Sequence, residues 1–222
     1  MARIARVVAP GMPHHITQRG NRRLPVFFCD ADYQTYLCLL STYCARYAVA
    51  VWAYCLMPNH VHLVAVPEHA DGLRGALGET HRRYTRHVNL RKGWRGHLWQ
   101  ERFASFVMDY RHTLAAVRYI ELNPVRAGLV TDAGAYRWSS ARAHLSGADD
   151  GVTQVAPLCS EIDDWEAFLR LDEEEATLAQ LQSCQRTGRP CGDDAFISQV
   201  ESLCGRTLHP KKPGPKGKKD AR

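Results

Sequence analysis

The sequence predicts an α+β protein built on a ferredoxin-like split β-α-β sheet, antiparallel and with helices on one face. Three observations favour this fold. Strand-like and helix-like patterns follow one another in the order β-α-β-β-α-β within residues 14–108. Two of the strand patterns are separated only by a short turn containing Pro-Asn, which is typical of an antiparallel hairpin. A further helical pattern follows, and we expect it to pack as an addition to the sheet.

The first half of the chain supplies three predicted strands and one helix. Residues 14–18 form the first extended segment, which ends at a turn-like Arg-Gly-Asn. A helix is predicted over residues 31–47, with Asp30 as its N-cap, because apolar side chains recur there at helical spacing. These side chains are Tyr33, Tyr36, Leu37, Leu40, Tyr43, Cys44 and Tyr47. Residues 49–56 and 60–66 then form the hairpin.

The second half supplies one more strand and several helices. A helix is predicted over residues 73–90 and a strand over residues 103–108. The third helix covers residues 113–122, and we expect it to end near Asn123 because Pro124 disfavours helical geometry in the residue before it. Two further helices are predicted over residues 165–182 and 193–204.

Charge divides the chain into three segments. The 222 residues carry a net charge of +6. Residues 1–147 hold 19 basic and 9 acidic side chains, residues 148–205 hold 3 and 13, and residues 206–222 hold 7 and 1. We therefore expect a basic body, an acidic and mostly helical extension, and a basic flexible tail. This pattern indicates a polyanionic partner, with nucleic acid the first choice.

The acidic extension admits two interpretations. It could fold back on the basic body and compete with DNA as a built-in brake. The alternative is a solvated acidic helix that only improves solubility, which is the commoner role of such charge runs.

Composition excludes several other classes of protein. The longest apolar runs are too short to cross a membrane, and the N-terminus lacks the apolar core and cleavage site of a secretory signal. We expect a cytoplasmic protein. None of the eight cysteines forms a Cys-x-x-Cys pair, which favours reduced and mostly buried thiols.

Two histidines one residue apart form the first candidate site. His60 and His62 open the second strand of the hairpin. Side chains on a strand alternate between its faces, so both imidazoles point the same way and could together bind a metal ion. Alternatively, both could line a hydrated face of the sheet and bond only to neighbouring groups.

Tyr119 and Asn123 form the second candidate site. They are four residues apart and therefore share one face of the third helix. That face could supply a nucleophile and a further metal ligand together. The alternatives are a core tyrosine and an asparagine that caps the C-terminal end of the helix.

Four segments in this order resemble one known family. They are MPNHVHLV, HRRYTRHVN, GHLWQERF and YIELNPVRAGLV. Together, within about residues 12–147, they resemble the REP-associated tyrosine transposases, which are domesticated bacterial single-tyrosine transposases of the His-hydrophobic-His nuclease superfamily. The resemblance implies that residues 1–147 form a catalytic domain, followed by the extension over 148–205 and the tail over 206–222.

The resemblance also implies an activity. His60 and His62 would bind Mg²⁺ or Mn²⁺ with Asn123 as an additional ligand, and Tyr119 would attack DNA and become linked to its 5′-phosphate. The expected activity is that of a single-strand DNA endonuclease and strand transferase in the bacterial nucleoid, acting on single-stranded DNA with hairpins from palindromic repeats. Relatives include both dimers and proteins that act alone, and the sequence does not decide between these states.

Basic and polar side chains clustered around these segments are the candidates for DNA contacts, because arginine suits phosphate. They are Arg19, Asn21, Arg22, Arg23, Arg82, Arg83, Arg86, Arg102, Arg126, Lys211 and Lys212.

Two other functions stay open. One is a DNA-binding repressor of the same fold without catalysis. The other is a zinc hydrolase, in which His14 or His15 on the first strand would serve as a further ligand.

Overall fold

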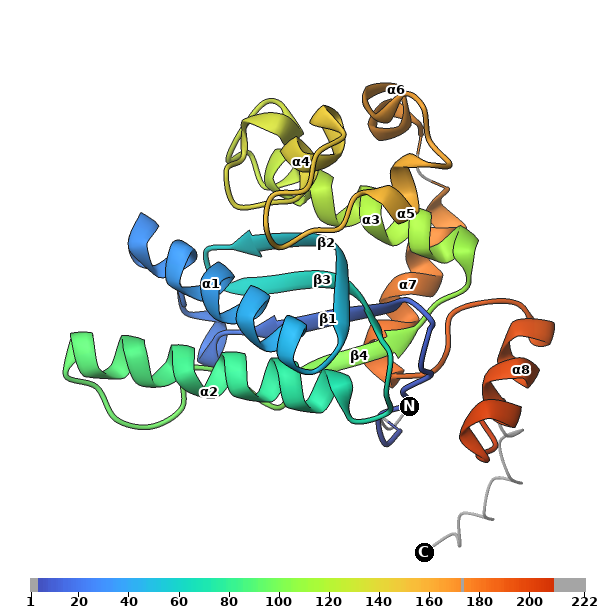
Figure 1. The fold of residues 1–222 in the computed structure, drawn as a ribbon, viewed down its shortest axis with the longest axis horizontal. Coiled ribbons are helices and arrows are strands. Elements are labelled where there is room, and N and C mark those ends of the chain that lie inside the picture. The colour runs from blue at the N-terminus through green and yellow to red at the C-terminus, as the bar shows by residue number, and fades with distance from the viewer. Residues whose placement is uncertain (1–3, 173, 210–222) are drawn as a thin grey trace, which may run out of the picture.

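The computed structural model describes residues 4–172 and 174–209. Its single sheet contains β1 (His14–Arg19), β2 (Val49–Met57), β3 (His60–Pro67) and β4 (Ala104–Val107). Their order is β2-β3-β1-β4, and every neighbouring pair is antiparallel (Figure 1). The first strand therefore lies between the third and the fourth, which is the split β-α-β arrangement. The predicted fold class is confirmed.

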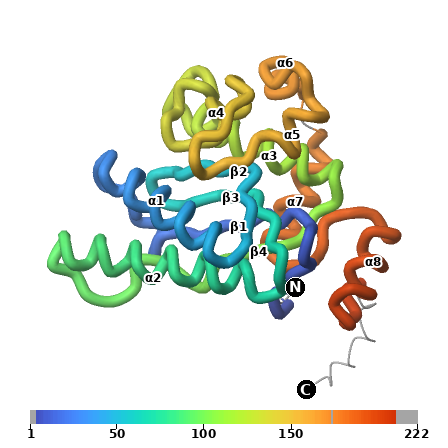
Figure 2. Tube along the Cα trace, in the orientation of Figure 1, coloured from blue at the N-terminus to red at the C-terminus, as the bar shows by residue number. Residues whose placement is uncertain are grey.

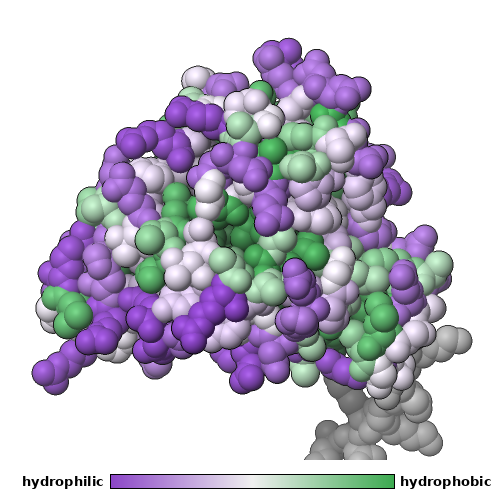
Figure 3. Space-filling model, viewed as in Figure 1, coloured by the Kyte–Doolittle hydropathy of each residue, from purple (hydrophilic) through white to green (hydrophobic). Residues whose placement is uncertain are grey.

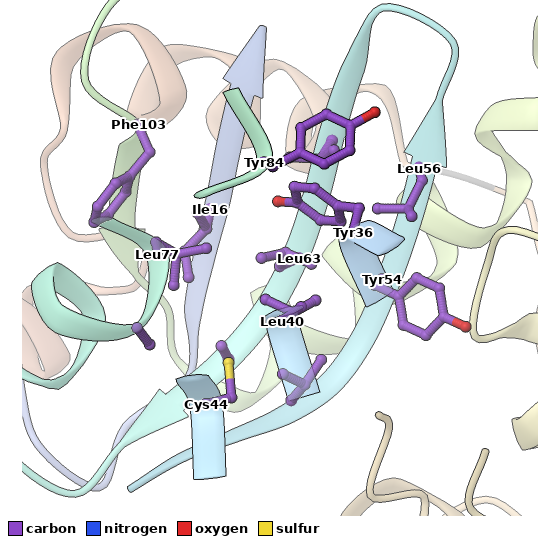
Figure 4. Close-up of a cluster of buried hydrophobic side chains, with 14 of the residues drawn as sticks. Ile16, Tyr36, Leu40, Cys44, Tyr54, Leu56, Leu63, Leu77, Tyr84 and Phe103 are labelled. Carbon is purple, nitrogen blue, oxygen red and sulfur yellow. The ribbon is translucent and has the colours of Figure 1, made fainter. Parts of the chain in front are cut away.

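Helices α1 (Asp30–Arg46) and α2 (Gly72–Lys92) cover one face of the sheet (Figures 1 and 2). Figure 4 shows the core between these layers, where Leu40 of α1 and Leu77 of α2 lie with Leu63 of β3. The phenols of Tyr36 and Tyr84 are also buried there. Each has a hydrogen-bond partner, His81 Nε2 at 2.9 Å for Tyr36 and the carbonyl of Val26 at 2.7 Å for Tyr84.

Helix α3 (Tyr110–Arg126) covers the opposite face. Its apolar side chains, such as Ile120, pack on the alternate strand residues Cys55, Val64 and Phe106. Strand alternation thus gives the sheet two separate cores, one under α1 and α2 and one under α3. The second core also borders the two histidines of β3.

The segment after α3 folds back onto the body. It contains α4 (Ala141–Ser146), α5 (Ala156–Cys159), α6 (Trp165–Arg170), α7 (Glu175–Thr187) and α8 (Asp194–Cys204), and short 3-10 turns occur at Asn21–Arg23 and Ala133–Ala135. Trp165 of α6 and Leu181 of α7 belong to the core under α3. Val200 of α8 packs on Val7 near the N-terminus. Residues 210–222, with the predicted basic tail and its Lys211 and Lys212, lie outside the described residues.

Several predicted element boundaries were wrong, among them the start of α3, which lies at Tyr110 and not at residue 113. Helix α3 does not end at Asn123 but continues through Pro124 to Arg126. Proline is tolerated there because it lies in the last turn, where only the backbone bond to the carbonyl of Ile120 is lost. Asp30 is not the N-cap of α1, because Asp30 is already helical and Cys29 precedes it as the cap residue.

The predicted helix over residues 165–182 is two helices, α6 and α7. Four consecutive acidic residues, 172–175, fall at the break. Like charges on one helical turn repel one another, which disfavours a continuous helix.

The described helices include none that is both long and apolar enough to span a lipid bilayer. Hydrophilic residues line the α2 side of the face shown in Figure 3.

Candidate active site

The two histidines of β3 share the face of the sheet that α3 covers. His62 is opposite Thr17 on β1, and His60 is opposite Arg19. Their ring centroids are 4.9 Å apart, with the rings edge to face. His62 is buried, with 2% of its surface exposed, whereas His60 is half-buried and bonds through Nδ1 to the side-chain oxygen of Asn59 at 2.5 Å.

Tyr119 faces this histidine pair from α3. Its ring centroid lies 5.9 Å from that of His62, and the two rings are nearly perpendicular. The guanidinium of Arg126 lies 5.0 Å from the centroid of the same phenol ring and donates a hydrogen bond of 2.9 Å to the carbonyl of Tyr119. One helix and one strand thus bring a phenol, two imidazoles and a positive charge together.

Asn123 lies one turn after Tyr119 on α3. It does not cap the helix, because the C-cap residue is Ala127, whose N–H donates to the Asn123 carbonyl. Its side-chain Nδ2 is buried and has no hydrogen-bond partner among the described residues. A buried donor without a partner costs about 1–3 kcal/mol, so this amide nitrogen fits a site completed by an acceptor such as a phosphate oxygen, whereas a metal ion could bind only the side-chain oxygen.

The histidines of β1 occupy two different environments. His14 bonds through Nδ1 to the carbonyl of Met12 at 2.8 Å and accepts at Nε2 from the N–H of Ala9 at 3.1 Å. Both of its ring nitrogens are therefore occupied, and it cannot serve as the third ligand of the zinc alternative. His15 bonds through Nε2 to Nδ1 of His62 at 3.0 Å. Among the described residues, no group of three or more His, Cys, Asp or Glu side chains could hold a metal ion.

Burial keeps these imidazoles neutral at neutral pH. Burial, and secondarily the positive charge of Arg19, lower the pKa of His60 to about 4. Burial also lowers the pKa of His62 well below its usual value, and the neighbouring rings and Arg19 add to the effect. A neutral imidazole keeps the lone pair that a metal ion requires. The two imidazoles therefore keep lone pairs that a divalent ion could use, and nitrogen donors suit Mn²⁺ better than Mg²⁺.

A cavity of about 210 Å³ opens beside the histidines. Its lining includes Thr17, Arg19, His60, His62, Arg102 and Gln185. Two of the predicted DNA-contacting arginines therefore lie with the histidine pair. Gln185 comes from α7, where its Nε2 donates to Thr17 Oγ1 at 3.5 Å. Nothing in the sequence singled out Gln185, because only the packing of α7 brings it to this cavity.

The other predicted DNA-contacting side chains among the described residues do not line this cavity, and three of them are on α2, which covers the opposite face of the sheet. Arg22 and Arg23 are exposed in a turn with left-handed φ values of 55° and 62°. Arg82 and Arg83 on α2 both pair with Glu79. Exposed positions are also occupied by Asn21, Arg86 and Arg126.

The sequence analysis did not identify one buried carboxylate near the tyrosine. Glu121, two residues after Tyr119, is fully buried. It accepts hydrogen bonds from Ser140 Oγ at 2.6 Å and Trp165 Nε1 at 2.9 Å, and it bonds to His144 Nδ1 at 2.6 Å. These bonds join α3 to α4 and α6 and so fix the helix that carries the tyrosine.

Comparison with known proteins identifies a family and solved structures that are similar to this chain. The model of a family described as "Transposase IS200 like" matches residues 9–123, more than half of the chain. No curated protein matches the chain. A solved structure of a REP-associated tyrosine transposase bound to a REP hairpin is 22% identical, with a TM-score of 0.55, and the match covers 70% of this chain and 90% of that one. This likeness shows a shared fold.

A second solved structure comes from Deinococcus radiodurans and is assigned as a transposase. It is 20% identical, with a TM-score of 0.38, and the match covers 54% of this chain and 95% of that one.

Proposed function

Because the chain belongs to the IS200-like transposase family, we propose that it is a metal-dependent single-strand DNA endonuclease and strand transferase with Tyr119 as nucleophile. The observation that carries this proposal is the position of the Tyr119 ring, 5.9 Å from the ring of His62. A nucleophile beside a pair of metal-binding side chains is the arrangement that such a reaction needs.

Each residue has a distinct role in the proposed reaction. Tyr119 attacks the phosphorus atom of a DNA phosphodiester, so a bond forms from its phenol oxygen to phosphorus and the bond to the 3′-oxygen breaks. The products are a 5′-phosphotyrosine and a free 3′-hydroxyl. Arg126 places positive charge beside the phenol, where negative charge develops as its proton is lost.

His60, His62 and Asn123 would hold the divalent ion, Mg²⁺ or Mn²⁺. When bound, such an ion polarises the phosphate and stabilises the charge on its oxygens. Arg19 and Arg102 line the adjacent cavity and would bind the neighbouring phosphates. The phosphotyrosine ester keeps the energy of the broken bond, so a 3′-hydroxyl can attack it and reseal the strand without ATP.

The proposed substrate is single-stranded DNA that carries a hairpin from a palindromic repeat. The REP hairpin bound to the relative of similar fold supports this class. The excess of basic residues in the body of the chain also supports a DNA partner.

A labelled hairpin with single-stranded flanks tests the proposal. Incubation with Mn²⁺ or Mg²⁺ should yield protein-linked DNA that survives denaturation, and Tyr119→Phe should abolish it. Tyr110→Phe is the matched control, because Tyr110 lies on the same helix outside the site and should leave the adduct unchanged. Binding without cleavage would support the repressor instead, and hydrolysis that survives Tyr119→Phe would support a hydrolase.

A further inference from the structure

His15 of β1 bonds to His62, one of the two histidines of the candidate metal site. We propose that His15 is a positioning residue that holds His62 in the tautomer with hydrogen on Nδ1, so that His62 presents its Nε2 lone pair to the metal. This inference rests on the proposed function for the presence of a metal, but it concerns a residue to which that function gives no role.

The sheet register brings the two rings together. Thr17 is directly opposite His62 on the paired strands, so His15, two residues earlier, is the diagonal neighbour on the same face. Nε2 of His15 lies 3.0 Å from Nδ1 of His62, and the ring centroids are 5.3 Å apart with the planes inclined by 17°. The edge-to-face ring of Phe106, with centroids 5.1 Å apart, limits the movement of His15.

The position of one hydrogen decides whether His62 has a free lone pair on Nε2. Each neutral imidazole carries one N–H, and only one of the two nitrogens in the contact can be the donor. If His62 donates from Nδ1, its Nε2 has a free lone pair. If His15 donates from Nε2, the hydrogen of His62 must lie on Nε2, and that nitrogen cannot bind a metal.

The surroundings favour the first arrangement. The first arrangement places the hydrogen of neutral His15 on Nδ1, which is buried without a partner among the described residues, whereas the second leaves an unpaired acceptor there. This nitrogen therefore does not favour the first arrangement, and the preference comes from the charge and the metal chemistry on the other side of His62. Arg19 lines the same cavity as His62. Its positive charge favours a lone pair over an N–H on the cavity side of the imidazole. Metal-binding histidines generally donate their second N–H to a neighbouring group, and His15 supplies that acceptor.

His15 is not itself a third metal ligand. Its Nε2 is engaged by His62, and it is not among the residues that line the cavity. Its contribution is therefore to orient and hold the ring of His62.

Binding of Mn²⁺ to the DNA-free protein, measured by electron paramagnetic resonance of free Mn²⁺, tests the proposal. His15→Leu removes the acceptor and should weaken Mn²⁺ binding by about 10–100-fold, the usual effect of losing such a partner. His15→Gln should bind within a few-fold of the wild type, because its amide oxygen can accept in place of Nε2. His14→Leu is the matched control, a neighbouring buried histidine that does not touch the site, and should leave binding unchanged.

The proposal is overturned if His15→Leu binds Mn²⁺ as tightly as the wild type, if His15→Gln loses as much as His15→Leu, or if the wild type binds no Mn²⁺. Nitrogen-15 NMR of histidine-labelled, metal-free wild-type protein adds a test that needs no variant. We expect the hydrogen of His62 on Nδ1, and hydrogen on Nε2 would overturn the proposal. Neither measurement involves DNA or Tyr119, so a protein that fails to cleave DNA could still meet both expectations.

Discussion

Two buried histidines, His14 and His81, are neutral in the folded protein at neutral pH, and this makes its stability depend on pH. Burial lowers the pKa of His14 to about 4, although its bond to the carbonyl of Met12 opposes the shift. Burial likewise lowers the pKa of His81 to about 3. In the unfolded chain both side chains would titrate near 6.5. The unfolded state therefore binds more protons below pH 6.5, and acid favours unfolding.

The free energy of unfolding should be highest above about pH 6.5 and fall as the pH drops toward 4. Each of these two histidines should lower the free energy of unfolding by about 2–3 kcal/mol by pH 4.5. Urea denaturation between pH 7.5 and 4.5 measures this loss. In His81→Gln the free energy of unfolding should depend less steeply on pH. A free energy of unfolding that stays constant across this range would contradict the prediction.

Single residues differed in how well the sequence predicted them. The sequence was sufficient to predict that His60 and His62 lie on the same face of a strand, because strand alternation depends only on local geometry. Glu121 was not predictable, because a carboxylate between the apolar residues Ile120 and Leu122 has the appearance of an exposed helix position. Its partners Ser140 and Trp165 are 19 and 44 residues away in the chain, and only tertiary packing brings them together.

Helix α3 depends on Glu121 for its position. The carboxylate is fully buried and holds three partners from other elements. If one of these donors is removed, a carboxylate oxygen of Glu121 loses a hydrogen bond, and water cannot replace it because Glu121 is buried.

Trp165→Phe should therefore destabilise the protein by about 1–3 kcal/mol. The substitution keeps an aromatic ring against His144, on which Trp165 now stacks with centroids 4.1 Å apart, but removes the N–H donor to Glu121. Chemical denaturation measures the change. Trp94→Phe, at an exposed tryptophan, is the control and should have little effect. Equal stability of the two variants would mean that the bond to Glu121 contributes little.

Element boundaries were less predictable than element types. The order of strands and helices through residue 126 followed from periodicity alone, and the sheet order followed from the topology that this sequence of elements favours. The end of α3 was mispredicted because a proline in a final turn costs less than one in the middle of a helix. Local rules for proline and capping do not include the packing of α3 against the sheet, which continues past Asn123.

At the scale of the whole molecule, the acidic extension is part of the packed structure. Its charge run favoured a solvated helix as the commoner of two interpretations, yet Trp165, Phe168 and Leu181 join the core under α3. The acidic residues around these apolar positions made the segment look solvent-exposed in the sequence. Deletion of the whole extension would open that core, so it cannot test whether the acidic residues compete with DNA.

Charge substitutions test the brake hypothesis without unfolding the protein. Glu174 pairs with Arg111 on the surface at 2.5 Å. If the extension competes with DNA for arginines, Glu174→Gln should strengthen DNA binding at low salt, whereas Glu166→Gln, which pairs with Arg170 of the same helix, should not. Equal affinity of both variants would favour the solvated acidic helix.

The basic tail should contribute to the affinity for DNA rather than to the stability of the fold. Leu208 is buried, and its N–H bonds to Glu201, so a truncation should begin after His209. Deletion of residues 210–222 should weaken DNA binding and flatten its salt dependence, by about 0.7 in logarithmic slope for each single-strand phosphate that the protein no longer neutralises. Binding isotherms at several salt concentrations measure this slope. The full-length protein with the tail lysines changed to glutamine is the control for chain length and should behave like the truncation.

The short distance between Tyr119 and His62 lies within one polypeptide. In the proposed reaction each molecule would therefore carry its own nucleophile and its own metal-binding imidazoles, and a second copy would supply neither. A mixture of Tyr119→Phe and His62→Ala proteins should therefore remain inactive on hairpin DNA. The proposed reaction should therefore keep its rate per molecule at dilutions at which two copies rarely meet.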